Sequence, residues 1–191
     1  MRSEIRSICK DHGLTGVYVT HDQEEALSMA DRLAVLSEGR IQQMGAPSDV
    51  YRNPVNQRVA EFMGETNILD VPLDWMEEQN RKLGIRLGSS RFSLALHERI
   101  PWRSNAGRLR VSIRPEAFSL TEGRGDRTSL AAVVTDVSYL GATLAIRVAL
   151  EDQSVVKVVV MNPSVPLIEP GARLNLTLLE SDIVPLCFSP L

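Results

Sequence analysis

The sequence of 191 residues contains few cysteines and no long apolar run. Its two cysteines, Cys9 and Cys187, stand at opposite ends of the chain, so no disulfide framework and no CxxC pair is predicted. No uninterrupted apolar stretch approaches the roughly 20 residues that a membrane-crossing helix needs. We therefore expect a reducing compartment for this chain and no direct insertion into a membrane.

Aromatic residues and lysines are also scarce. Aromatics make up 5% of the chain, the lysines are Lys10, Lys82 and Lys157, and the net charge is −3. Nucleic-acid binders usually carry a basic face, and those that hold single strands stack the bases on aromatic side chains. The composition therefore argues against nucleic acid as a partner, whereas 43% hydrophobic residues are typical of a globular protein.

Helical and strand patterns alternate in the first 63 residues. Ile5 and Ile8 lie three apart and predict a short helix, and Asp22 with Glu25 forms an Asp-x-x-Glu cap that predicts a helix start. From such signals we expect a helix over residues 2–10, a strand over Gly16–Thr20, a helix from Asp22, a hairpin of Leu33–Leu36 with Arg40–Met44, a helical turn at Ser48–Tyr51 and a helix after Pro54.

The character of the sequence changes at Gly64–Asp70, a stretch that is typical of a linker. Beyond it come short, mostly alternating stretches separated by glycine- and proline-containing turns, a spacing typical of a small β-barrel or sandwich. The predicted strands are Lys82–Leu87, Arg91–Leu96, Leu109–Ile113, Ala131–Val137, Thr143–Ala149, Val155–Val160 and Arg173–Leu178. We therefore predict two domains, residues 1–66 and residues 67–191.

His21 is the most informative single residue. It follows the predicted strand Gly16–Thr20 directly before the capped helix, at the rim where α/β sheets bind ligands. An imidazole at this rim can donate a hydrogen bond to an anionic oxygen. From local geometry alone, the plainer interpretation is favoured, namely a polar residue that fills the turn between strand and helix.

Several runs in the first 67 residues occur together and in order. They are Val19–Ala26, Ala30–Leu36, Glu38–Ile41, Gly45–Pro47, Val50–Tyr51, Asn53–Pro54 and Val59–Asn67. Together they resemble the H-loop, or switch-histidine, region of ABC-transporter ATP-binding subunits, of the importer type that serves polyamines, sugars, glycerol phosphate or ferric iron. In that family the histidine contacts the γ-phosphate of ATP, so the resemblance implies a catalytic role for His21 in an intact subunit.

The second part of the chain fits the same family. Val111–Glu116, with Arg-Pro-Glu at a strand end, and Asp136–Thr143 resemble elements of the TOBE domain that follows these ATPases. The plainer interpretation of Arg114 is an ion pair with Glu116 or another carboxylate, with Pro115 ending an edge strand. TOBE domains are OB-like β-barrels, and the resemblance implies that they hold two ATPase subunits together and regulate transport.

The fold class that the resemblance implies is α+β. Residues 1–66 would be a partial α/β remnant of the ATPase nucleotide-binding domain, and residues 67–191 a TOBE-type (OB-like) β-barrel. Because most neighbours of the strand Gly16–Thr20 would be missing, we expect residues 1–63 to be partly rearranged, disordered or buried in a homodimer.

Several parts of such an ATPase have no counterpart in this sequence. A phosphate-binding loop needs Gly-Lys-Ser/Thr at the start of a helix, and no Gly-Lys pair, Leu-Ser-Gly-Gly-Gln signature or Q-loop candidate occurs. Phosphoryl transfer needs several loops and Mg²⁺ together, so we expect ATP and Mg²⁺ to be cofactors of the intact subunit only. This chain alone is expected to lack ATP hydrolysis and cofactor-binding residues. Cys9, His12 and His21 lack a fourth ligand, so no metal site is expected either.

The expected function is that of the C-terminal part of a longer ATP-binding subunit, whose intact form couples ATP hydrolysis to solute uptake. Its expected partners are a second copy and membrane permease subunits, in the cytoplasm at the inner face of the plasma membrane. The alternative is a stand-alone OB-like module that binds small oxyanions. Related molybdate-binding proteins carry a Ser-Ala-Arg-Asn run, which Arg103–Ala106 does not match, and this weighs against the alternative.

Overall fold

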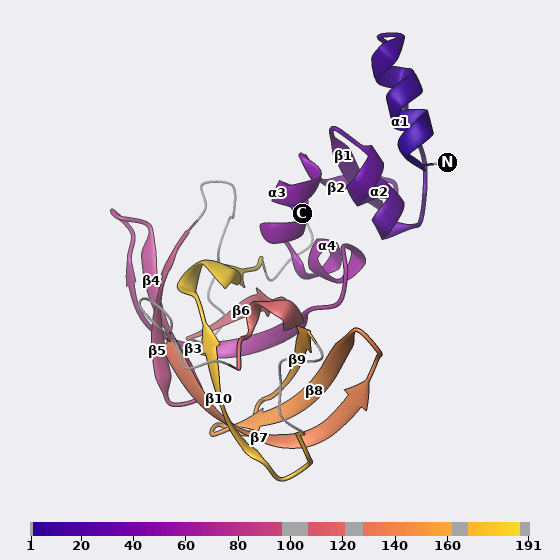
Figure 1. The fold of residues 1–191 in the computed structure, drawn as a ribbon. Helices are drawn as coiled ribbons and strands as arrows, with labels where there is room; N and C mark the ends of the chain where they lie inside the picture. Colours follow the sequence, from indigo (N-terminus) through magenta and orange to yellow (C-terminus); the bar gives the residue numbers. More distant parts are fainter. Residues whose placement is uncertain (1, 97–106, 121–127, 162–167, 188–191) are drawn as a thin grey trace. The chain divides into compact units, whose positions relative to one another are not determined.

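The computed structural model describes residues 2–96, 107–120, 128–161 and 168–187. The chain divides into two units, of which the first ends at Gly64 and the second begins at Glu65 (Figure 1). No helix among the described residues is long and apolar enough to cross a membrane.

The first unit consists of short helices and one β-hairpin. Its elements are α1 (Arg2–Asp11), α2 (Gln23–Met29), β1 (Leu33–Ser37), β2 (Arg40–Gly45), α3 (Pro47–Arg52) and α4 (Gln57–Phe62). The hairpin turns at Glu38 and Gly39, which both have positive φ, as the twist of a two-residue hairpin requires. Its core is formed by Leu33, Val35, Val50, Val59 and Met63. These elements confirm the predicted helices and the predicted hairpin.

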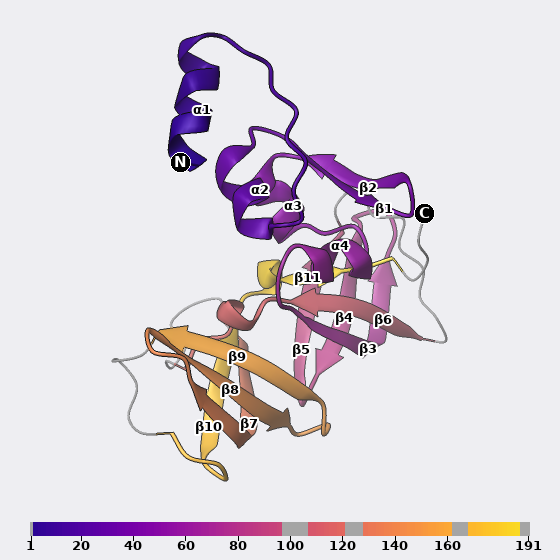
Figure 2. The same cartoon turned by 90° about the vertical axis from the view of Figure 1, so that its right-hand side faces the viewer.

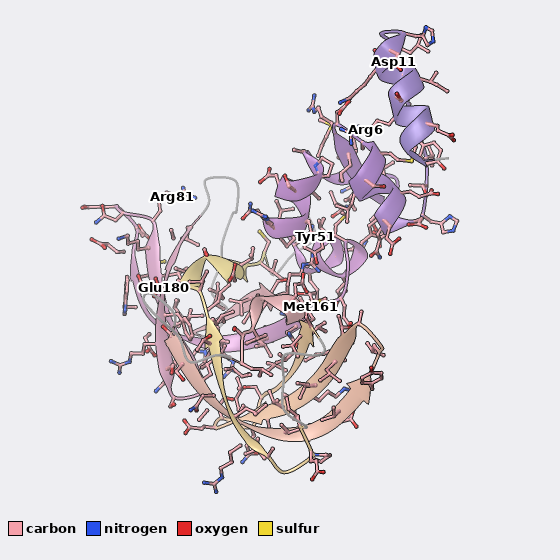
Figure 3. All side chains as sticks on the ribbon, viewed as in Figure 1. Arg6, Asp11, Tyr51, Arg81, Met161 and Glu180 are labelled. Carbon is pink, nitrogen blue, oxygen red and sulfur yellow. The ribbon has the colours of Figure 1, made fainter. Side chains whose placement is uncertain are left out.

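Arg6 connects helix α1 to the end of α2 (Figure 3). Its Nη1 donates to the carbonyl oxygen of Ser28 at 2.9 Å, and its Nη2 donates to Asp31 Oδ1 at 3.0 Å. Both contacts are exposed to solvent, so each contributes about 1 kcal/mol or less to the position of α1.

The predicted strand Gly16–Thr20 is wrong. Residues 14–20 belong to no helix or strand, and the exposed fractions of Val17 and Val19 are 94% and 90%. β-branched residues favour strands, but a strand also needs a neighbour for its N–H and C=O groups. The described residues supply no such neighbour for this segment.

The second unit is formed by antiparallel strands in two sheets, with strand orders β11-β6-β3-β4-β5 and β10-β7-β8-β9. The strands are β3 (Asn67–Glu77), β4 (Lys82–Leu87), β5 (Ser90–Ala95), β6 (Arg108–Ile113), β7 (Thr128–Tyr139), β8 (Thr143–Leu150), β9 (Val155–Met161), β10 (Arg173–Leu178) and β11 (Ile183–Pro185). Two single 3₁₀ turns, η1 (Pro115–Ala117) and η2 (Glu180–Asp182), follow β6 and β10. All seven predicted strands are confirmed, with ends shifted by at most a few residues.

Both sheets are curved, and their inner faces share one hydrophobic core (Figure 2). Alternating side chains supply it, so that Leu83, Ile85 and Leu87 of β4 are all fully buried. The opposite sheet contributes residues such as Ile146 and Leu176. The second unit is therefore mostly β-sheet and consistent with the expected OB-like barrel.

The predicted linker Gly64–Asp70 is wrong in its second half. Asn67–Asp70 begin β3, a strand in the interior of its sheet that pairs with β6 from Asn67 opposite Ile113 to Pro72 opposite Arg108. The polar start of this strand resembles a linker because Thr66 and Asn67 bind neighbouring strands through their side chains. Those partners are distant in sequence and leave no local signal.

Candidate functional site

The candidate site is the bend that carries His21. Asp22 caps helix α2, since its Oδ1 accepts a hydrogen bond from the backbone N–H of Glu25 at 3.1 Å. One residue before His21, the hydroxyl of Thr20 accepts from the backbone N–H of Asp22 at 2.9 Å. The residues on both sides of His21 are thus held by local hydrogen bonds, as the Asp-x-x-Glu pattern predicts for Asp22.

The carboxylate of Glu25 closes this bend from the helix side. Its Oε2 accepts from Thr20 Oγ1 at 2.8 Å and from the hydroxyl of Tyr18 at 3.1 Å. Hydrogen bonds to a charged acceptor are stronger than those between neutral groups. Glu25 therefore attaches the segment before His21 to the first turn of α2.

The side chain of His21 lies at the surface of the first unit. Its side chain is exposed and makes no hydrogen bond or ion pair with the described residues. An imidazole in this setting is available to donate to an anionic oxygen. The described part of the chain offers this donor alone, without a phosphate-binding loop around it, so the residues present do not by themselves fit ATP and Mg²⁺.

The other residues singled out from the sequence are not brought together with His21. His12 is exposed, Cys9 is half-buried, and no metal-ligating group of three or more His, Cys, Asp or Glu occurs among the described residues. Cys187 is buried in the second unit, and this burial raises the pKa of its thiol. Arg103–Ala106 lie outside the described residues.

Arg114 binds the backbone at the beginning of the second unit. Its Nη1 donates to the carbonyl oxygen of Glu65 at 3.1 Å. The carboxylate of Glu65 in turn forms an ion pair with Lys157 Nζ at 2.5 Å. The sequence favoured an ion pair of Arg114 with Glu116 or another carboxylate, and it gave no indication of this contact to the backbone of Glu65.

Asn67 is the polar residue that sequence reasoning missed. It is buried, and its side chain donates to the carbonyl oxygens of Ile113 at 3.2 Å and Lys157 at 2.8 Å, while its Oδ1 accepts from the N–H of Lys157 at 2.7 Å. Asn67 therefore joins β6 of one sheet to the edge strand β9 of the other. The partner residues lie so far along the chain that no local sequence motif predicts these hydrogen bonds.

Asp70 is held by two arginines on the same sheet. Arg110 Nε and Nη2 donate to its two carboxylate oxygens at 2.7 and 2.8 Å, and Arg108 binds its backbone carbonyl. The hydrogen bond from Arg110 is the main reason why the pKa of Asp70 is lowered, and the charges of both arginines act in the same direction. Partial desolvation opposes this shift.

Comparison with known proteins finds one domain match and a group of relatives. Residues 111–186 match the TOBE domain family. The chain is 38% identical over 153 residues to the spermidine/putrescine import ATP-binding protein PotA of Ruegeria pomeroyi, a match that covers 80% of this chain and 39% of that protein. It is 39% identical over 158 residues to the spermidine/putrescine import ATP-binding protein PotA 1 of Pseudomonas aeruginosa, covering 83% of this chain and 41% of the relative.

A further relative and one solved structure complete the comparison. The Fe(3+) ions import ATP-binding protein FbpC of Fusobacterium nucleatum is 32% identical over 183 residues, covering 96% of this chain and 47% of the relative. The chain thus spans less than half the length of these curated relatives. A molybdate-bound structure of the cytoplasmic molybdate-binding protein ModG is similar with a TM-score of 0.52 at 13% identity, covering 62% of this chain and 94% of the other. At this identity the likeness concerns the fold alone.

Proposed function

Because most of this chain is homologous to the carboxyl-terminal region of ABC-importer ATP-binding subunits, we propose that it performs the non-catalytic tasks of that region. These tasks are the association of two subunits and the regulation of transport. The observation that carries the proposal is the 38–39% identity that extends over about 80% of the chain, across both of its units.

The first unit is proposed to be the end of a nucleotide-binding domain. The bend of Thr20, Asp22 and Glu25 supports this role because it presents His21 outward, where a phosphate bound by other loops could be reached. His21 would then act as the switch histidine of an intact subunit, donating a hydrogen bond to the γ-phosphate. The described residues around His21 include no loop that holds a triphosphate, and we propose that the chain alone does not hydrolyse ATP.

The second unit, from Glu65 onward, is proposed to be the TOBE-type barrel that joins two subunits. Its partners would be a second copy and the permease subunits of an importer, at the cytoplasmic face of the plasma membrane. The spermidine/putrescine importers among the relatives favour a polyamine as the solute of the intact system.

The decisive experiment is a calorimetric titration of the purified chain with Mg·ATP. We expect no saturable heat up to millimolar nucleotide, because the sequence has no Gly-Lys loop to hold the phosphates. Saturable binding in the micromolar range would overturn the proposal, since it would reveal a complete nucleotide site in this chain. A parallel titration with molybdate tests the alternative function, and saturable heat there would favour an oxyanion-binding module instead.

A further inference from the structure

A shallow hollow lies on the outer face of the four-stranded sheet, the face turned away from the hydrophobic core. Its volume is about 470 Å³. Ala131, Val133 and Ala149 form its floor, and these short side chains are the reason why the face is hollowed here. Longer polar side chains from Arg173 and Glu151 stand at its rim.

The strand register places these residues in two rows. In the first row Arg173 of β10 lies opposite Val133 of β7, which lies opposite Ala149 of β8. The row ends at Val155 of β9, which pairs with Ala149 and is exposed. This row crosses all four strands and is apolar from Val133 to its end.

The second row lies two residues further along the strands. It contains Asn175 opposite Ala131, with Glu151 following the end of β8 beside them. Arg173 and Glu151 therefore occupy opposite corners of the hollow, one on β10 and the other at the end of β8. The line between them crosses the apolar floor.

Neither charged residue at the rim has a partner of opposite charge in the described part of the chain. Arg173 and Glu151 are exposed, and neither forms a hydrogen bond or ion pair there through its side chain. In the other sheet of the second unit, by contrast, Arg110 is paired with Asp70 and Arg86 with Asp74. Two opposite corners of the hollow thus carry one positive charge, on Arg173, and one negative charge, on Glu151.

We propose that this face is where a second copy of the chain docks, an inference that rests on the proposed role in subunit association and names its surface. A two-fold axis that lies in the plane of the face, across the line from Arg173 to Glu151, brings each Arg173 over the partner subunit's Glu151. Such an interface is isologous and closed, because the same patch serves both copies. It forms two equivalent ion pairs across the dimer.

The shape of the hollow suits this arrangement. An arginine side chain has an apolar stem and a charged head, so it can cover apolar surface while its guanidinium reaches an acid. Arg173 of each copy would lie over the floor of Ala131 and Val133 in the other. The same contact removes the exposed Val133 from water, which is favourable for association.

Charge reversal at the two corners tests this surface. Sedimentation velocity over a concentration series gives the dimer dissociation constant of the wild-type chain, of Arg173→Glu, of Glu151→Arg and of the double variant. We expect each single variant to dimerise at least tenfold more weakly, because like charges then face each other twice. The double variant exchanges the two charges and should regain dimerisation to within about threefold of the wild type.

Lys82→Glu is the control for charge reversal away from this face. Lys82 is exposed on β4 of the other sheet and does not line the hollow, so its reversal should leave the dissociation constant within about twofold. A dimer that is unaffected by the single variants would overturn this surface and leave the proposed function standing. A wild-type chain that stays monomeric at high concentration would overturn self-association itself. The Mg·ATP titration is independent of both results.

Discussion

The side-chain amide of Asn67 makes two hydrogen bonds to the backbone of Lys157, a residue that lies 90 positions further along the chain. The N–H of Lys157 donates to Oδ1 at 2.7 Å, and Nδ2 donates to the carbonyl oxygen of the same residue at 2.8 Å. Since β9 is an edge strand, its outward N–H and C=O groups would otherwise lie unpaired. The amide of Asn67 therefore takes the place of a neighbouring strand at this point.

Substitution of Asn67 should weaken the second unit substantially. Asn67→Ala removes both hydrogen bonds to Lys157 and the one to Ile113, and it leaves partly buried backbone groups unsatisfied, so we expect a loss of about 2 kcal/mol in the free energy of unfolding. Urea denaturation followed by circular dichroism measures this. Asn80→Ala, in an exposed turn, is the control and should cost less than about 0.5 kcal/mol. Equal losses in the two variants would show that the contact to Lys157 contributes nothing specific.

Gly84 leaves room for the indole of Trp75, and a methyl group there should displace the indole. A Cβ at residue 84 would stand 2.1 Å from Trp75 Nε1, so Gly84→Ala should cost about 1–3 kcal/mol and move the indole of Trp75, a residue that is already 46% exposed, further into water. In a Trp102→Phe background Trp75 is the single tryptophan, and its fluorescence should shift to the red. Gly16→Ala, which meets nothing closer than 3.8 Å, is the control. An unshifted spectrum for Gly84→Ala would contradict the packing.

The strands of the second unit could be predicted because their signal is local. Alternation of apolar and polar residues gave Lys82–Leu87 and Arg173–Leu178 with the same ends that the structure has. The first strand, β3, was missed because Pro72 interrupts its pattern and its polar start is stabilised by partners such as Lys157. Contacts of that separation are set by the tertiary fold and not by neighbouring residues.

In the candidate site, too, the prediction that rested on a local signal was confirmed and the one that needed distant neighbours was wrong. The cap at Asp22 follows from residues three apart and is confirmed. The strand predicted before His21 would need neighbouring strands that the described residues do not contain, and that prediction was wrong. The catalytic role of His21 stays a prediction from resemblance, because an exposed imidazole with no partner does not identify a reaction.

The ion pair of Asp70 with Arg110 should make the stability of the second unit depend on pH. The pKa of Asp70 is lower in the folded chain than its ordinary value of 3.8, so its contribution is present above that value and is lost as pH falls through the folded-state pKa. Asp70→Asn should therefore lower the free energy of unfolding at pH 7, and the difference from wild type should shrink towards pH 3. Chemical denaturation at several pH values measures it.

Asp136→Asn is the control for this pH dependence. Asp136 is exposed, and its carboxylate makes no hydrogen bond or ion pair with the described residues. Its variant should follow the wild-type profile at every pH. If Asp70→Asn kept a constant difference from wild type between pH 7 and pH 3, the ion pair would not be the source of the stabilisation.

The stability of the bend around His21 should depend on the side chain of Asp22 and not on that of His21. Asp22→Ala removes the acceptor of the Glu25 N–H, and loss of such a cap costs about 1 kcal/mol of helix stability. Hydrogen exchange at the Glu25 amide should then be about fivefold faster, which is the ratio that this free energy predicts. His21→Ala should leave that exchange rate unchanged, because the imidazole is exposed and makes no contact within the described bend. A slower or equal rate in Asp22→Ala would contradict the cap, and a faster rate in His21→Ala would mean that the histidine holds the bend rather than being presented by it.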